Sequence, residues 1–421
     1  MANTYLSRTI STATNEYKGT LSWWQKGMST DSTQYILACE SGNERLLWYG
    51  TSGRFQGGLR ASSTPPDIDF TLSGTPRFRD PNAWYHCVLA WDTTQGTASD
   101  RMRFYVNNVE YTVNGSGTSG VNDIPQNHVM PMNKNGLPFR IGSQISGGSY
   151  FEGVMSHMHF VDGIQYTPST FGETDSTTGE WKIKEDPSGI TYGNNGFWWL
   201  KDTNAATDSS PNSNTPSISG TLTKTEDCPS NVFATMNPLN YTSSAIAYVN
   251  GNTKPQYPGS WIASLGTLGA KTGKYFWEAK VVSGNNANLF YGISKPNIDL
   301  DSTPQNQTGV ICQHINGDRY IDTTYTASAA EALTNGDILG VALDLDSGTK
   351  TVKFYKNGTL LSSSSSINLT STYDNEFVLP FFAGNNSSAS SAWEVNFGNG
   401  YFATTAVSSA GTNASGNGIF E

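Results

Sequence analysis

The sequence predicts an all-β protein of two tandem antiparallel β-sandwiches, joined by an irregular but packed connector, and three observations lead to this prediction. Residues 341–360 alternate apolar and polar side chains in two runs, and the second run ends in Asn357-Gly358, a hairpin signal. Residues 88–92 and 103–108 repeat this pattern, with a strand ending in Asp followed by a strand ending in Asn-Asn. No segment has a convincing helical period. Two halves with one pattern therefore indicate two sandwiches.

The length of the chain agrees with two domains and a connector. At 421 residues, the chain is too long for one ordinary hydrophobic core. We expect a first sandwich over residues 1–172 and a turn-rich, aromatic connector over residues 173–237. A second sandwich with a polar C-terminal tail is expected over residues 238–421.

Strand signals follow one another through the first half, separated by Gly, Ser and Asn. They lie at residues 20–26, 35–39, 46–49, 55–60, 68–72, 84–92, 101–113, 138–142 and 151–163. In the strand 20–26, Leu21 and Trp23 share the face that we assign to the core, and Trp24 lies on the opposite face. In the last strand, Val154, Met158 and Phe160 are assigned to the core.

This series of strands resembles the laminin G-like, concanavalin A-like lectin sandwich over about residues 5–172. The resemblance rests on residues 21–24, on the strand 84–92 with its partner 104–107, and on residues 151–153. In that family these motifs, including His86, are structural. The resemblance also implies that calcium can bind through loop Asp and Asn residues, although no ligand set is identifiable here.

The connector suggests a biological context. Residues 192–200 are too aromatic to lie free in solvent, so we expect them to pack on a neighbouring domain or subunit. The order of residues 160–163, 168–173 and 192–197 resembles the passage from lectin domain to connector in virion proteins of tailed bacteriophages, especially marine ones. That resemblance implies a virion surface protein, on the tail or capsid exterior. It also implies a homo-oligomer, trimeric if the protein is a fibre.

The second half resembles a SPRY domain over about 160 residues. The motifs occur in order at residues 273–281, 290–294, 336–344, 352–358, 379–382 and 395–398. The resemblance implies a β-sandwich that binds protein partners through loops at one end, without catalysis. We expect residues 418–421 to be either unpaired or paired with a neighbouring chain.

Composition excludes several classes of partner. The net charge is −10, and the Lys and Arg residues form no dense run, which argues against nucleic acid. We find neither a signal peptide nor an apolar run of about 18 residues, so we expect synthesis in the host cytoplasm and no membrane insertion. The four cysteines lack metal-ligand spacing, and Cys39 and Cys87 are interpreted as small buried hydrophobic residues.

No catalytic constellation stands out. A glycoside hydrolase needs two carboxylates across the scissile bond. The Glu-x-Asp-x-x-Glu strand of concanavalin A-like glucanases is absent. The pairs Asp67/Asp69 and Asp344/Asp346 fit strand ends and turns better. We therefore expect a protein that is not an enzyme.

The candidate ligand-binding residues are aromatic. Trp24, Trp198 and Trp199 could each stack on a pyranose ring, because an indole face offers an apolar, CH-rich contact. Packing against the connector or against a neighbouring element is the alternative for all three.

His157 and His159 are the metal candidates, since they occupy positions i and i+2 of one strand, on the face opposite the core. A third ligand is not identifiable. An exposed or sheet-packed pair of imidazoles is the alternative, and no cofactor is otherwise expected.

The sequence thus favours a non-enzymatic phage adhesin, a tail fibre or receptor-binding component that recognises host surface glycan or protein. One alternative is a capsid-attached fibre or a decoration or assembly protein that binds other virion subunits. The other is a polysaccharide depolymerase on a lectin fold.

Overall fold

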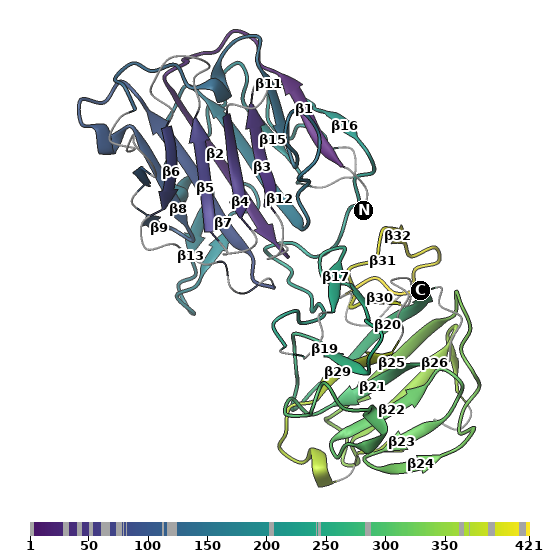
Figure 1. Cartoon of the computed structure of the whole chain (residues 1–421). Coiled ribbons are helices and arrows are strands. Elements are labelled where there is room, and N and C mark those ends of the chain that lie inside the picture. Colours follow the sequence, from purple (N-terminus) through teal and green to yellow (C-terminus); the bar gives the residue numbers. More distant parts are fainter. Residues whose placement is uncertain are drawn as a thin grey trace. The chain divides into compact units, whose positions relative to one another are not determined.

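The computed structural model is all-β, and its described residues form strands and short 3₁₀ turns (Figure 1). The described residues are 4–27, 33–39, 44–49, 54–59, 68–72, 78, 80, 82–111, 113–115, 124–201, 206–240, 242, 246–282, 288–361, 366–369, 371–385, 392–411 and 418–421. The chain divides into two compact units, Met1–Lys224 with Cys228–Asn231, and Thr225–Asp227 with Val232–Glu421. In the described part of the chain, no helix is long and apolar enough to span a membrane.

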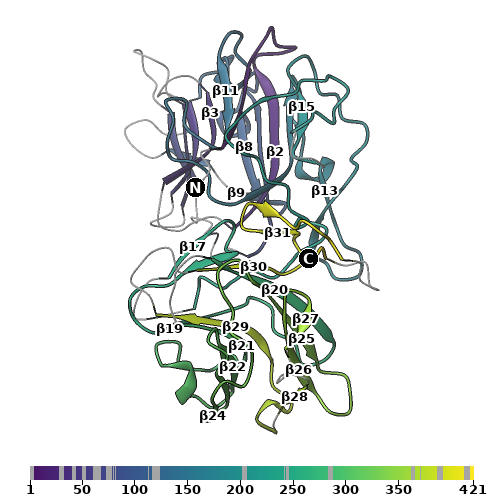
Figure 2. The same ribbon diagram turned by 90° about the vertical axis from the view of Figure 1, so that its right-hand side faces the viewer.

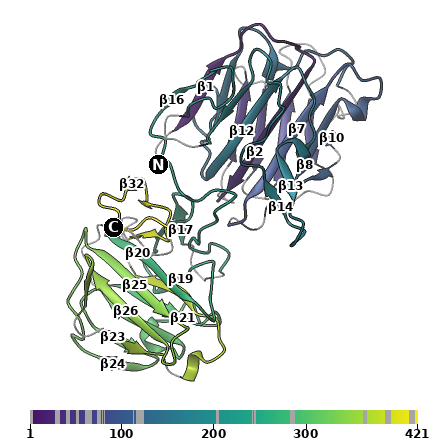
Figure 3. The same ribbon diagram turned by 180° about the vertical axis from the view of Figure 1, so that it is seen from behind.

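The first unit is a sandwich of two antiparallel sheets, as predicted (Figures 1 and 3). The eight-stranded sheet has the order β10 (Val113–Gly115), β6 (Ile68–Leu72), β5 (Arg54–Leu59), β4 (Glu44–Tyr49), β3 (Thr33–Cys39), β11 (Pro138–Ile141), β1 (Tyr5–Thr9), β16 (Ser217–Ser219). The six-stranded sheet has the order β15 (Phe197–Trp199), β12 (Val154–Asp162), β2 (Lys18–Lys26), β7 (Tyr85–Asp92), β8 (Met102–Val106), β9 (Val109–Tyr111). Leu21 and Trp23 are fully buried in the core between the sheets, as the alternation in β2 predicts.

A bulge in β12 corrects one predicted face. The register with β2 shifts between Ser156 and His159, and His157 has a φ of 45°. The extra residue reverses the alternation, so Met158 and Phe160 lie in the core while Val154 packs beside Trp24 on the outer face. The assignment of Val154 to the core was therefore wrong.

The predicted connector packs on the first sandwich through strands of its own. Hairpin β13–β14 (Gly172–Thr174 and Trp181–Ile183) lies on the outer face of the six-stranded sheet, and Ile183 and Trp181 pack with Trp24 there. Strand β15 pairs with β12, and β16 pairs with β1. The connector thus completes one edge of each sheet.

Asp162, at the end of β12, ties this connector to the sandwich. Its buried carboxylate accepts hydrogen bonds from the amides of Thr14 and Asn15 and from the side chain of Asn133. It also accepts two from Asn195, through the backbone N–H and the side-chain Nδ2. The carboxylate therefore holds the N-terminal segment and the connector loop together.

The second unit is also a two-sheet sandwich (Figures 1 and 2). One sheet has the order β17 (Ala247–Val249), β18 (Lys254–Gln256), β30 (Ala392–Asn396), β20 (Lys274–Val282), β25 (Ile338–Asp344), β26 (Thr351–Lys356), β27 (Thr359–Leu360), with β28 (Ile367–Asn368) beside β26. The other has the order β19 (Ile262–Leu265), β29 (Leu379–Gly384), β21 (Leu289–Ser294), β22 (Val310–His314), β23 (Arg319–Ile321), β24 (Thr324–Thr326). A two-stranded ribbon, β31 (Tyr401–Phe402) and β32 (Thr405–Ala406), follows β30.

The two predicted hairpins are confirmed. Strands β25 and β26 pair along their length, and the carboxylate of Asp344 accepts the amides of Asp346 and Ser347 in the connecting turn. Asn357 and Gly358 have φ values of 48° and 76°, the left-handed pair of a type I′ turn into β27. The Asn-Asn pair between β8 and β9 has the same geometry, as described below.

The C-terminal residues are paired within the chain, which corrects both expectations for residues 418–421. Ile419 forms a parallel bridge with Asn399, and its carbonyl accepts a hydrogen bond from Asn396 Nδ2. The Oε2 atom of Glu278 accepts the amide of Glu421 at 3.1 Å and Asn396 Nδ2 at 3.2 Å. Glu278 itself is buried on β20.

This contact predicts a pH-dependent stability. Burial, aided by the nearby charge of Glu421, raises the pKa of Glu278 from 4.5 to about 7. A carboxyl group whose pKa is raised by folding stabilises the fold fully below its unfolded pKa, and this contribution disappears as the pH rises through 7. We expect Glu278→Gln to match the wild type near pH 4, since the amide oxygen keeps both hydrogen bonds. At pH 8 the variant is expected to exceed the wild type by up to about 3 kcal/mol, because it has no buried charge to desolvate.

Urea unfolding of the two proteins at both pH values measures this difference. Glu394→Gln is the matched control, because Glu394 lies on the adjacent strand and is paired with Lys254 at 2.9 Å. A Glu278→Gln protein that tracks the wild type at every pH would contradict the prediction.

Candidate functional site

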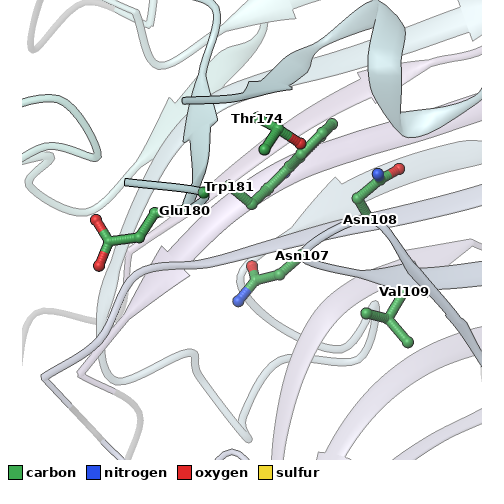
Figure 4. Close-up of a pocket in the computed structure, with 7 residues that line it drawn as sticks. Asn107, Asn108, Val109, Thr174, Glu180 and Trp181 are labelled. Carbon is green, nitrogen blue, oxygen red and sulfur yellow. The ribbon is translucent and has the colours of Figure 1, made fainter. Parts of the chain in front are cut away.

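A cleft of about 490 Å³ opens on the first unit between the β8–β9 turn and hairpin β13–β14 (Figure 4). Its volume falls in the roughly 300–1,000 Å³ range of small-molecule sites. One indole ring, amide groups, a hydroxyl and a carboxylate line it. The lining residues are Asn107, Asn108, Val109, Thr174, Gly179, Glu180 and Trp181.

The β8–β9 turn forms one wall and is fixed to the neighbouring strand β7. Asn107 and Asn108 have φ values of 46° and 65°, which asparagine tolerates better than most residues. The side-chain oxygen of Asn107 accepts the amide of His86 at 2.8 Å, and the amide of Asn107 donates to the carbonyl of His86 at 2.9 Å. The turn therefore holds one conformation before any ligand arrives.

The opposite wall is hairpin β13–β14, which is closed by a polar turn. The carboxylate of Asp175 accepts hydrogen bonds from the backbone amides of Thr177 and Thr178. It also forms an ion pair with Lys182 at 3.2 Å. Hydrogen bonds from Thr178 and Thr177, then the one from Lys182, lower the pKa of Asp175 to about 2. The turn thus keeps an ionised carboxylate at its centre, and Thr174 pairs with Trp181 across the hairpin.

Trp181 is held in place from two sides. Its indole N–H donates to Nδ1 of His86 at 3.0 Å, and the two rings are inclined by only 17° with centroids 5.9 Å apart. They therefore lie edge to edge rather than face to face. Gly172 leaves room for the indole, since a Cβ at that position would lie 2.5 Å from Cζ2 of Trp181.

His86 has a defined protonation state. An indole N–H can only donate, so Nδ1 of His86 must be the unprotonated acceptor, and the proton of the neutral ring lies on Nε2. Nε2 is 2.8 Å from the hydroxyl oxygen of Ser22, which accepts the hydrogen bond that Nε2–H donates. Burial lowers the pKa of His86 to about 3, so the ring stays neutral at physiological pH. Its backbone fixes Asn107 and its ring fixes Trp181, so His86 positions both walls of the cleft.

The rings of the three candidate tryptophans are buried and packed against other side chains. Trp24 is only 3% exposed, and its ring stacks on His86 at 4.7 Å, so it has no free face for a sugar. Trp199 is fully buried in the core, where it stacks on Phe197. Trp198 is 7% exposed and stacks on His159 at 4.8 Å, with Lys201 over its ring. Each ring is occupied by packing, the alternative stated for all three.

The two metal-candidate histidines lie side by side but are engaged by other groups. The rings of His157 and His159 both contact Trp198. Nδ1 of His157 lies 2.7 Å from the hydroxyl of Ser156, and Nδ1 of His159 lies 2.8 Å from that of Tyr192. Burial holds the pKa of His159 well below its usual range. Among the residues that the structure describes, no three His, Cys, Asp or Glu side chains gather as a metal site.

The cleft residues were not predicted as site residues. Asn107 and Asn108 were recognised only as hairpin residues. Trp181 directly follows the polar residues 173–180, a pattern typical of a turn. The one sequence feature that could have indicated the cleft was a single Trp at the end of this polar run. The sequence could not show that this Trp returns to the outer face of the first sandwich.

Several polar groups of the cleft remain available. Four side-chain groups form no hydrogen bond or ion pair within the described ranges. They are the nitrogen of Asn107, the carboxamide of Asn108, the hydroxyl of Thr174 and the carboxylate of Glu180. The nitrogen donates, the carboxylate accepts, and the amide of Asn108 and the hydroxyl do both. The cleft therefore combines a fixed aromatic ring with unused donors and acceptors, which suits binding of a small polar ligand.

Comparisons with known proteins agree with the two sandwiches. Residues 2–169 match the family described as the concanavalin A-like lectin/glucanases superfamily, and residues 274–400 match the SPRY domain family. No curated protein gives a significant match.

Three of the similar chains among solved structures are SPRY domains. The SPRY domain of human HERC1 shares 17% identity, with 38% of this chain and 96% of that chain covered and a TM-score of 0.32. A human SPRY domain shares 16% identity, with 34% and 90% covered and a TM-score of 0.28. The TRIM65 PSpry domain shares 12% identity, with 39% and 90% covered and a TM-score of 0.31. The family matches and the two sandwiches together identify a concanavalin A-like domain followed by a SPRY domain.

Proposed function

We propose that this chain is a non-enzymatic surface adhesin of a tailed bacteriophage, which recognises a glycan or protein on the host cell. The observation that carries the proposal is the cleft beside Trp181, a preformed site with unused polar groups on a lectin-type sandwich. The second domain adds another binding-type fold. Both domains are suited to recognition.

The chemistry of the cleft supports binding rather than hydrolysis. Glycoside hydrolases place two carboxylates about 5–9.5 Å apart across the scissile bond. Of the described residues that line the cleft, Glu180 alone carries a carboxylate. A depolymerase at this site would lack its second acid or base.

The phage context of the proposal rests on the sequence of the connector. The motif order in residues 160–163, 168–173 and 192–197 resembles phage virion proteins, and Asp162 and Asn195 of that motif are in direct contact. On this basis the protein is made in the host cytoplasm and assembled on the virion surface with other virion proteins. It forms a homo-oligomer, trimeric in a fibre, and neither binds nucleic acid nor inserts into a membrane.

Three measurements test the function. Mass spectrometry of purified particles is expected to find the chain, and the fluorescently labelled full chain is expected to bind intact host cells saturably. The host polysaccharide is expected to keep its length during incubation with the protein.

Each contrary outcome points to one alternative. Absence from particles would refute the virion assignment. Presence in particles without binding to cells would indicate an assembly or decoration role. Shortening of the polysaccharide would indicate a depolymerase.

A further inference from the structure

We propose that the cleft beside Trp181 binds a neutral, pyranose-containing saccharide; this inference rests on the adhesin function proposed above and names the ligand class at its site. Hairpin β13–β14, which supplies one wall, lies beyond residues 2–169 that match the lectin-type family. The site is thus built by a segment outside the matched region, added to a turn of the sandwich.

The apolar part of the cleft suits the face of a sugar ring. Trp181 is half-buried and lines the cleft. Val109, on the opposite wall, is 57% exposed and lines the same cleft. A pyranose presents several C–H groups on one face, and an indole or an aliphatic side chain excludes water from such a face. The cleft therefore offers two apolar surfaces, one from each wall, to a bound ring.

The polar part suits ring hydroxyls. The amide groups of Asn107 and Asn108, the hydroxyl of Thr174 and the carboxylate of Glu180 come from both walls (Figure 4). A sugar hydroxyl both donates and accepts, so the hydroxyls of one ring can pair with amide, hydroxyl and carboxylate groups alike. A few convergent polar groups around an apolar surface are what orient a small ligand in a site.

Charge selects against acidic sugars. Among the residues that the structure describes, no Lys or Arg lines the cleft, whereas Glu180 does. The basic residue on the hairpin, Lys182, is paired with Glu173 at 3.4 Å and with Asp175 at 3.2 Å. A uronic or sialic acid carboxylate would meet a like charge without a cation to offset it, in a chain of net charge −10. Charge therefore favours a saccharide without acidic groups, and the proposed ligand is neutral.

The cleft is preorganised through His86. The backbone N–H and carbonyl of His86 each form a hydrogen bond with Asn107, and the ring of His86 accepts one from Trp181. Binding therefore does not have to order either wall, which preserves affinity for a small ligand.

The first experiment applies the labelled full chain to an array of neutral and acidic oligosaccharides. The neutral set carries terminal glucose, galactose, mannose and their N-acetylated amines, and the acidic set carries sialic acid, uronic acid or sulfate. Calorimetry then gives the Kd of the best neutral oligosaccharide. We expect binding to neutral members only, with Trp181→Ala weakening it by about tenfold or more.

Two further variants keep the test independent of folding. Asn108→Gly removes the amide while keeping a residue that favours the positive φ of the turn, so it is expected to weaken binding with the fold intact. Gly172→Ala places a Cβ against the indole of Trp181 and is expected to weaken binding by displacing the ring. The matched control is Gly96→Ala, where nothing lies within 4 Å of the added Cβ, and its affinity should equal that of the wild type.

The outcomes separate this inference from the proposed function. Host-cell binding that persists in Trp181→Ala and Asn108→Gly would overturn the cleft assignment and leave the adhesin function standing. Binding of acidic sugars through these residues, or of no saccharide at all, would also overturn it. In a further outcome, the chain binds a neutral saccharide through Trp181 and yet fails to bind host cells. That result would support the saccharide assignment of the cleft and contradict the adhesin function.

Discussion

Replacing Asp162 by alanine is expected to destabilise the first sandwich by about 3 kcal/mol or more. The carboxylate is 1% exposed and accepts hydrogen bonds from Thr14, Asn15, Asn133 and Asn195. Alanine removes every acceptor and leaves these N–H donors facing a void. Buried donors without partners cost far more than the net value of the hydrogen bonds they lose.

The conservative change Asp162→Asn is expected to be nearly as harmful. Every group of the described residues that forms a hydrogen bond with this carboxylate is a donor, so an amide nitrogen in place of one carboxylate oxygen would face N–H groups. Asp175→Asn is the matched control, since Asp175 also accepts backbone amides but lies in an exposed turn. Its cost is expected to be small.

Urea unfolding measures the global loss, and hydrogen–deuterium exchange locates it. Faster exchange is expected at the amides of Thr14, Asn15 and Asn195, which lie in separate segments joined by this carboxylate. Wild-type stability in both Asp162 variants, or faster exchange confined to β12, would show that the carboxylate does not hold the connector to the sandwich.

The same residue explains part of what the sequence predicted. Strands and hairpins followed from local pattern, because alternation and Asn-Gly or Asn-Asn turns act over a few residues. The packed connector followed from its aromatic content. The contacts that hold the connector to the sandwich could not be predicted, because Asp162 binds Thr14 and Asn195, which are distant from it along the chain.

The bulge in β12 and the cleft could not be predicted from the sequence, for two different reasons. A single extra residue at His157 reverses the alternation in β12 without changing its composition, so Val154 was assigned to the wrong face. The cleft is assembled by His86, Asn107 and Trp181 from distant segments. Trp24 was chosen because it points away from the core, yet hairpin β13–β14 covers that face and supplies Trp181 instead.

In the second sandwich, Gly292→Ala is expected to cost about 3 kcal/mol or more, the upper end of overpacking effects. Gly292 lies in the middle of β21, opposite Cys312 on β22 and Phe381 on β29. A Cβ there would lie 2.0 Å from the carbonyl oxygen of Ile311 and 2.8 Å from Cα of Cys312. Both atoms belong to the backbone of β22, so relief of the clash requires the two central strands to separate.

This clash gives a physical reason for one of the motifs that identify the domain. Residues 290–294 were recognised as a SPRY motif, and the structure shows that Gly292 allows close approach of the paired strand. Gly348→Ala is the control, because nothing lies within 4 Å of its added Cβ in the turn after β25. Urea unfolding should separate the two variants by the full expected cost, with faster amide exchange in β21 and β22 of Gly292→Ala alone. Equal stability of both variants would mean that the strands have room for a methyl group, and that another constraint explains glycine in the motif.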